Sequence, residues 1–198
     1  MNTEIIKTKS KYSYSTAIRK LILAQFGAAI LAIMTSLPTI TITSNGTLLG
    51  IATTILALVF YFYLQYSAIW DIAAKDKLAI DGKRMTNDSK RGLKAALLAN
   101  IPTYILVVLS VVFKAVHLFT DIKVVGLCFN IAYAAELFWN YMYHGLLVLI
   151  VPDAKSALSL LYFASFAILT IPSLICCFIA YKMGLKGKHI FPEKKKNN

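Results

Sequence analysis

Residues 48–70 read LLGIATTILALVFYFYLQYSAIW, a stretch without a single charged side chain. A helix rises about 1.5 Å per residue, so some 20 apolar residues cross the ~30 Å hydrocarbon core of a bilayer. Such a helix also satisfies its own backbone hydrogen bonds inside lipid. Tyr61, Tyr63, Tyr66 and Trp70 crowd its second half, as is typical of rings at the headgroup boundary. The sequence therefore predicts a membrane-spanning helix here.

Apolar segments of this kind recur along the whole chain. Hydrophobic residues make up 58% of the sequence, whereas soluble domains contain about 45–50%. Mean hydropathy is +0.66. We expect an all-α integral membrane protein with one multi-pass domain over residues 1–198, a bundle of five hydrophobic helices at about 18–37, 48–70, 95–113, 124–151 and 157–181.

Local signals mark helix ends and one face of small residues. The first segment is expected to stop at Pro38, and the second to continue beyond the membrane as far as Gly82. Small residues recur every fourth position in the first segment, at Ala24, Ala28 and Ala32. Such a face allows close approach of another helix in lipid, either within the bundle or from a partner protein.

The charge distribution indicates a membrane protein and not a nucleic-acid-binding one. The formal net charge is +12. The net positive charge is concentrated in residues 1–20, 71–94 and 182–198, each of which adjoins an apolar segment. This placement orients a membrane protein and favours contact with anionic lipid, so no nucleic-acid partner is expected. Lys195 and Lys196 also resemble a di-lysine retrieval signal, but a lipid anchor is the preferred interpretation.

The same charges predict the orientation in the membrane. Residues 71–94 hold seven Lys and Arg, whereas the connection at 38–47 holds none. The N-terminus and loop 71–94 are therefore expected in the cytoplasm, most simply at the plasma membrane.

The side on which the basic tail 182–198 lies depends on segment 124–151. Five crossings, the preferred arrangement, would place the tail outside against the charge rule. A re-entrant segment 124–151 would leave four crossings and return the tail to the cytoplasm. Glu136 makes this segment the weakest inserter, because a carboxylate at mid-membrane costs about 2.5–3.5 kcal/mol. Both arrangements stay open.

Signatures of catalysis and of cofactor or metal binding are missing from the sequence. It has no G-x-S-x-G, H-E-x-x-H, Walker or dinucleotide-binding motif. The cysteines and histidines have no zinc-site spacing. Four aspartates occupy the basic loop at irregular intervals and are interpreted as a salt-bridged surface: Asp71, Asp76, Asp81 and Asp88. Two of them form i,i+4 pairs, Asp71 with Lys75 and Asp81 with Lys77. We expect no enzyme, no cofactor and no metal site.

A polar stripe in segment 124–151 is the sharpest candidate site. Glu136, Asn140 and His144 are four residues apart, which places them on one face of a continuous helix, and Tyr133 extends that face. An ionisable residue within a membrane segment is a functional-site candidate by default.

The alternative for the stripe, which we prefer, is structural. The stripe would then face the bundle and hydrogen-bond to Gln65, Asn100 or a tyrosine.

Two segments contain a similar proline motif, Asn100-Ile101-Pro102-Thr103 and Thr170-Ile171-Pro172-Ser173. A proline in a membrane helix frees a carbonyl group in the preceding turn, so kinks are predicted at Pro102 and Pro172. The match could mark an internal repeat, as transporters have, but two independent kinks are the preferred interpretation.

Two classes of function remain. The first and preferred is a small non-enzymatic accessory subunit that binds a membrane protein or a second copy through small-residue faces and the basic loop. The second is a transport component that moves protons or a small solute past the polar stripe.

Overall fold

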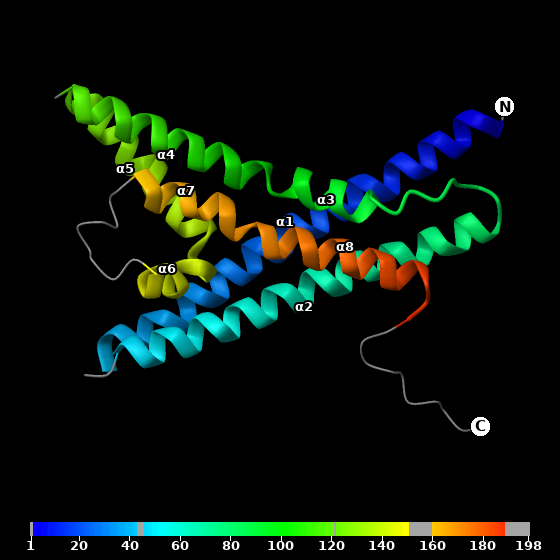
Figure 1. Ribbon diagram of the computed structural model, residues 1–198, viewed down its shortest axis with the longest axis horizontal. Coiled ribbons are helices and arrows are strands. Elements are labelled where there is room, and N and C mark those ends of the chain that lie inside the picture. The colour runs from blue at the N-terminus through cyan, green and yellow to red at the C-terminus, as the bar shows by residue number, and fades with distance from the viewer. Residues whose placement is uncertain (1, 43–45, 121, 151–159, 189–198) are drawn as a thin grey trace. The chain divides into compact units, whose positions relative to one another are not determined.

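The computed structural model describes residues 2–42, 46–120, 122–150 and 160–188 of the chain. Within these residues the fold is all-helical (Figure 1). The α-helices, with one 3-10 turn at Tyr141–Tyr143, are α1 Asn2–Ile42, α2 Gly46–Asp81, α3 Arg91–Ala99, α4 Ile101–Phe119, α5 Lys123–Trp139, α6 His144–Ile150, α7 Leu160–Leu169 and α8 Ile171–Leu185.

Four helical stretches are long and apolar enough to cross a membrane: Tyr14–Ser36, Leu49–Asp81, Ile101–Phe119 and Tyr162–Leu185. Large apolar side chains also stand exposed along the helices; on α4, Ile105 and Val108 are 54% and 59% exposed. Water-soluble proteins rarely leave such surfaces uncovered, whereas lipid covers them at no cost. The chain is consistent with an integral multi-pass membrane protein.

The first two helices are longer than the apolar segments within them. We expected the first helix to stop at Pro38, but α1 continues to Ile42. A proline inside a membrane helix removes one hydrogen bond and need not end the helix. Helix α2 ends beside Gly82, where we expected it to end, but the left-handed residue is Lys83, with φ 53°. The backbone N–H of Arg84 bonds to the carbonyl of Ala79, closing a Schellman-type cap.

Segments 95–113 and 157–181 each consist of two helices. Helix α3 ends at Ala99 and α4 begins at Ile101, while α7 ends at Leu169 and α8 begins at Ile171. The interruptions fall at Asn100 and Thr170, two residues before a proline in both cases. Proline cannot donate to the preceding turn and collides with its carbonyl group, which explains both positions.

Segment 124–151 is not one continuous helix, and this corrects our expectation. Helix α5 has 17 residues and stops at Trp139, and α6 has 7 residues. Neither stretch is among the candidate spans. The described residues thus hold four candidate spans, as in the alternative arrangement. The break invalidates the assumption that Glu136, Asn140 and His144 share one continuous helical face.

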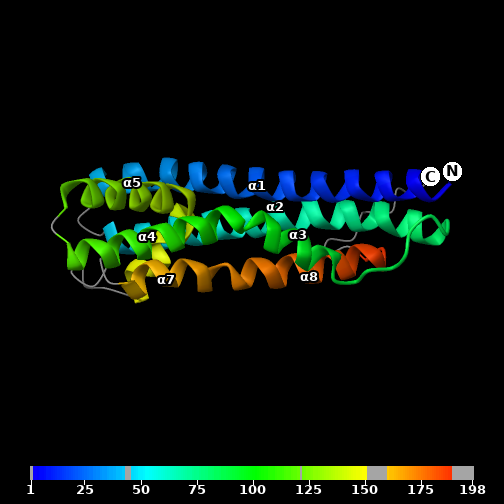
Figure 2. The same cartoon turned by 90° about the horizontal axis from the view of Figure 1, so that it is seen from above.

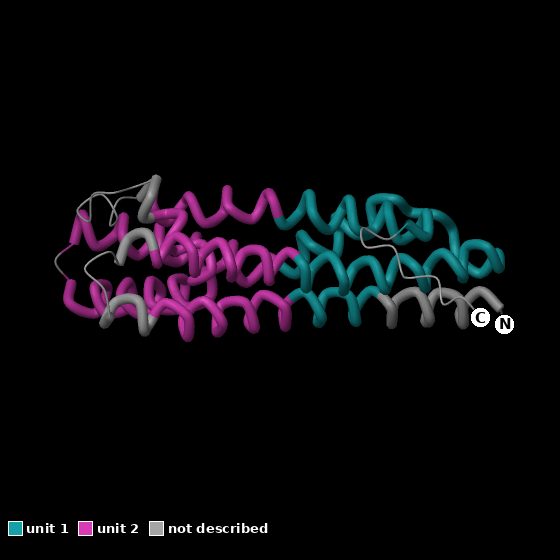
Figure 3. Tube along the Cα trace, turned by 90° about the horizontal axis from the view of Figure 1, so that it is seen from below, with its two compact units in different colours: residues 1–21, 63–99, 173–198 teal, residues 22–62, 100–172 magenta. Residues whose placement is uncertain are grey.

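Contacts divide the chain into two compact units (Figure 3). Unit 1 comprises residues 1–21, 63–99 and 173–198, and unit 2 comprises residues 22–62 and 100–172. Each is described by itself below, and the expectation of a single domain stays a prediction.

Unit 2 packs around an aromatic core. Helices α4 and α5 lie side by side in both views (Figures 1 and 2). Phe163 of α7 packs edge-on against Phe129 of α5, with ring centroids 5.6 Å apart. Ala28 and Ala32 of α1 belong to this core, and Ala24 is also buried. The small-residue face of α1 is therefore used inside the fold and is not open to a partner.

Unit 1 contains the basic loop and its ion pairs. Asp71 Oδ2 of α2 accepts hydrogen bonds from the Nζ atoms of Lys75, one turn later, and of Lys20 on α1, each at 3.0 Å. The second expected pair, Lys77 with Asp81, does not form among these described residues. Because these three side chains are 41–68% exposed, the two pairs contribute little to stability.

Candidate functional site

Glu136 is the most unusual polar residue of unit 2. It lies in the last turn of α5 and is completely buried. Neither carboxyl oxygen has a hydrogen-bond partner among the described residues. Ser110 of α4 is also fully buried and interacts with the Glu136 carboxyl group, but its hydroxyl does not reach hydrogen-bond geometry. Burying a carboxylate without a partner costs several kcal/mol, so this residue calls for an explanation.

Asn140 ends helix α5. Its backbone N–H and its side-chain Nδ2 both donate to the carbonyl oxygen of Glu136, at 3.0 and 3.2 Å. The sequence led us to expect Asn140 in mid-helix, where it could bond to the Glu136 carboxyl group. Instead the amide satisfies the end of the helix backbone, and its buried Oδ1 has no partner in the part of the chain that the structure describes.

Tyr133 lies one turn before Glu136 on α5, whereas His144 does not continue the stripe. The Tyr133 ring stacks on Phe129, with centroids 6.1 Å apart, and meets Phe163 edge-on, so it belongs to the aromatic core. His144 begins α6, beyond the helix break, and its ring stacks on Tyr141 at 5.2 Å. The separation of His144 from Glu136 follows from the break at Asn140.

The start of α4 forms a polar junction with α1 and α5. The Thr103 hydroxyl accepts hydrogen bonds from Gln25 Nε2 at 3.0 Å and from Trp139 Nε1 at 3.1 Å. Asn100, at the break before α4, is buried. Trp139 immediately precedes Asn140, so this junction fixes the end of α5 that carries Glu136.

Unit 1 contains a corresponding junction after the second proline motif. Gln65 Nε2 of α2 donates to the Ser173 hydroxyl of α8 at 2.8 Å. Gln65 was expected as a partner of the Glu136 stripe, and it bonds to Ser173 instead. In both motifs, the hydroxyl that follows the proline accepts a bond from a buried glutamine.

The chain order of these two junctions argues against duplication. The bonded pairs are α1 with α4 and α2 with α8. In a tandem repeat, both members of one pair would precede both members of the other. The order is instead consistent with two independent kinks.

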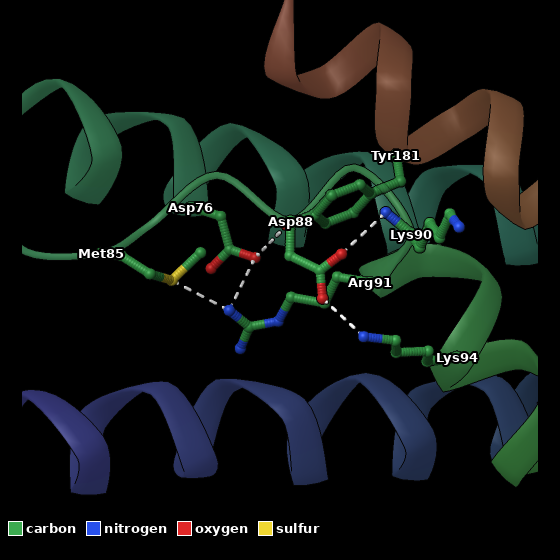
Figure 4. A network of polar contacts seen from close by, with 7 residues as sticks. All are labelled: Asp76, Met85, Asp88, Lys90, Arg91, Lys94 and Tyr181. Carbon is green, nitrogen blue, oxygen red and sulfur yellow. Dashed lines mark hydrogen bonds and ion pairs between the residues drawn. The ribbon is translucent and has the colours of Figure 1, made fainter.

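A second polar network, in unit 1, was missed from the sequence (Figure 4). Asp76 is only 4% exposed, so it is not part of the expected salt-bridged surface. Its Oδ2 lies 3.4 Å from the Arg91 guanidinium of α3 and accepts a hydrogen bond from the Tyr181 hydroxyl of α8 at 2.9 Å. A signal existed: Asp76 continues the buried face of α2 formed by Ile69, Ile72 and Ala73.

Arg91 is held from several sides, whereas its neighbour Asp88 is exposed to solvent. The Arg91 guanidinium approaches the sulfur of Met85 at 2.9 Å and lies over the Tyr14 ring. Asp88 accepts the backbone N–H of Lys90 just before α3, as expected of a capping residue. A hydrogen bond from Lys94 holds the pKa of Asp88 below its usual value. Asp76 and Arg91 are therefore the structural pair of this loop.

Among the described residues, no cluster of three or more His, Cys, Asp and Glu side chains could hold a metal ion. Protein-family models, curated proteins and solved structures show no match to this chain, so the site is interpreted from its own geometry.

Proposed function

We propose that this multi-pass membrane protein is a transport component that moves protons or a small solute past Glu136. The observation that supports this function is the buried carboxyl group, which has no hydrogen-bond partner within residues 2–42, 46–120, 122–150 and 160–188. An ionisable group within a membrane bundle is costly, and such groups mark ion and proton pathways. A purely structural carboxyl group would be expected to have its hydrogen bonds satisfied.

Helix geometry supports the same proposal. Transporters commonly place their sites where membrane helices are interrupted. Glu136 precedes the break at Asn140, and Trp139 connects that end of α5 to Thr103, close to the break at Asn100.

An accessory role is the second candidate. The Ala24–Ala28–Ala32 face proposed for partner binding is buried in the fold, which weakens this role. Another small residue of α1 supports it: a Cβ at Gly27 would meet no atom within 4 Å, and Phe26 and Ile30 beside it are exposed. This face could receive a helix of a membrane partner or of a second copy. Gly27→Leu should then remove a co-purifying partner or dissociate a dimer in mild detergent.

The proposal includes a non-enzymatic role and contact with anionic lipid. The sequence contains no catalytic motif, and loop 71–94 brings basic side chains next to the membrane segments. We place this loop and the N-terminus on the cytoplasmic side of the plasma membrane.

Proton flux tests the transport proposal. In liposomes with an imposed K⁺ diffusion potential, the wild-type protein should acidify or alkalinise an entrapped pH dye faster than empty liposomes. Glu136→Gln should abolish the flux, because an amide cannot release a proton. Asp81→Asn, which alters an exposed acid at the end of α2, should retain it. A flux that persists in Glu136→Gln would refute a role for this carboxyl group in proton transport.

Cysteine labelling tests the orientation. In a cysteine-free background, Ser89→Cys and Lys123→Cys place single thiols at exposed positions in the basic loop and at the start of α5. An impermeant maleimide should label only Lys123→Cys in intact cells, and both after permeabilisation. Labelling of Ser89→Cys alone in intact cells would reverse the orientation.

A further inference from the structure

We propose that the Glu136 site binds a monovalent metal cation of the Na⁺ type, in competition with a proton. This inference rests on the proposed transport function and names its substrate class. The ligands assigned to the cation are the carboxyl oxygens of Glu136, Oδ1 of Asn140 and the hydroxyl of Ser110.

These oxygens share two properties: they are buried, and they make no hydrogen bond within the described residues. Glu136, Asn140 and Ser110 are each fully buried, and all four oxygens have no hydrogen-bond partner among the described residues. Asn140 is oriented by the bond from its Nδ2 to the Glu136 carbonyl, which leaves Oδ1 as an acceptor. Ser110 of α4 interacts with the carboxyl group without completing a hydrogen bond. Four buried oxygens that no hydrogen bond satisfies form an environment that a cation would stabilise.

The local charge has the sign and size that a monovalent cation requires. Glu136 supplies one negative charge, and the C-terminal end of α5 adds the negative end of a helix dipole. No ion pair of Glu136 is found within the described residues. The phenols of Tyr133 and Tyr162 lie nearby, and the Lys114 ammonium lies over the Phe129 ring.

The ligand chemistry excludes other classes of cation. Carboxylate, amide and hydroxyl oxygens are hard ligands, which suit alkali and alkaline-earth ions and not soft transition metals. A single carboxylate balances one charge, whereas divalent ions in proteins generally collect more than one. A proton can occupy the same carboxylate, so proton and metal ion should compete.

Thermal unfolding of the purified protein in detergent tests this assignment. NaCl, KCl and LiCl are titrated against N-methylglucamine chloride at constant ionic strength, at pH 6 and pH 8. At least one metal ion should raise Tm in proportion to the logarithm of its concentration above Kd, by about 5 °C at 100-fold excess over its Kd. The apparent affinity should be higher at pH 8, because fewer protons compete.

Matched variants identify the ligands. Glu136→Gln should remove the ion-specific rise in Tm, and Ser110→Ala should weaken the apparent affinity about tenfold, roughly the contribution of one ligand oxygen. Asp81→Asn should respond like the wild-type protein. Ser110→Ala keeps the test informative if Glu136→Gln fails to fold.

The outcomes separate this inference from the proposed function. An equal response to all salts, or an unchanged ion-specific response in Glu136→Gln, would overturn the cation site. Proton flux in liposomes without any ion-specific stabilisation would keep the transport function and show that the carboxyl group carries protons only. Specific stabilisation without flux of either ion would keep the site and overturn transport.

Discussion

Replacing Arg91 by leucine should lower the free energy of unfolding by about 3–5 kcal/mol, because Asp76 would remain buried without its cation. The two side chains are only 9% and 5% exposed, with 3.4 Å between the guanidinium nitrogen and the carboxylate oxygen. Tyr181 would still donate to Asp76, but one neutral hydrogen bond does not replace a full charge.

Denaturant titration in mild detergent, followed by tryptophan fluorescence, would measure this effect. The double variant Asp76→Leu/Arg91→Leu should recover most of the loss, because neither charge is then left unpaired. Lys94→Leu provides a surface control: Lys94 pairs with Asp88 at 2.8 Å, but both side chains are largely exposed, so the cost should stay below about 1 kcal/mol. Equal losses for Arg91→Leu and Lys94→Leu would contradict a buried, energetically dominant pair.

The second large effect is expected at Gly184, where α8 approaches α2. A Cβ added there would lie 2.5 Å from the Cβ of Ala73 and 2.8 Å from the carbonyl oxygen of Trp70. Neither atom belongs to a flexible chain end, so the two helices would have to separate. Gly184→Val should therefore cost about 2–3 kcal/mol of stability, at the upper end of typical overpacking effects.

Gly27→Val is the matched control, because it introduces the same side chain into α1 at a position with no atom within 4 Å of the new Cβ. Its effect should stay within about 0.5 kcal/mol. Thermal unfolding of both variants, under identical detergent conditions, would show the contrast. A similar loss in both would mean that the loss at Gly184 does not come from the contact with Ala73.

The broken helices show where a local pattern was sufficient. Each Ile-Pro motif predicts a disturbance of the helix, and the chain is interrupted at Asn100 and at Thr170. Proline acts through its own ring and its missing N–H, which accounts for both interruptions, although α1 continues through Pro38. The partners of these breaks could not be read in the same way. Gln25 meets Thr103, and Gln65 meets Ser173, because in each unit two segments distant in sequence pack together.

Only part of the candidate site could be predicted, because local patterns identify single residues but not their partners. An acidic residue in an apolar segment identifies Glu136 from the sequence alone, because its burial is costly wherever it packs. The stripe drawn through Asn140 and His144 assumed an unbroken helix, and the end of α5 at Trp139 removed that basis. Asp76 was assigned to the surface because it lies in a charged loop, whereas α3 and α8 cover it.

The sequence by itself determined the helical class, the positions of the apolar segments and the basic regions between them. These features depend on the transfer of each segment from water to lipid, which is nearly a sum over its own residues. Only the tertiary structure decided that residues 124–151 break at Asn140, that Asp76 pairs with Arg91 and that the alanine face of α1 is internal. Each of these depends on which side chains from distant segments meet, and a buried polar group is stable only where that packing supplies its partner.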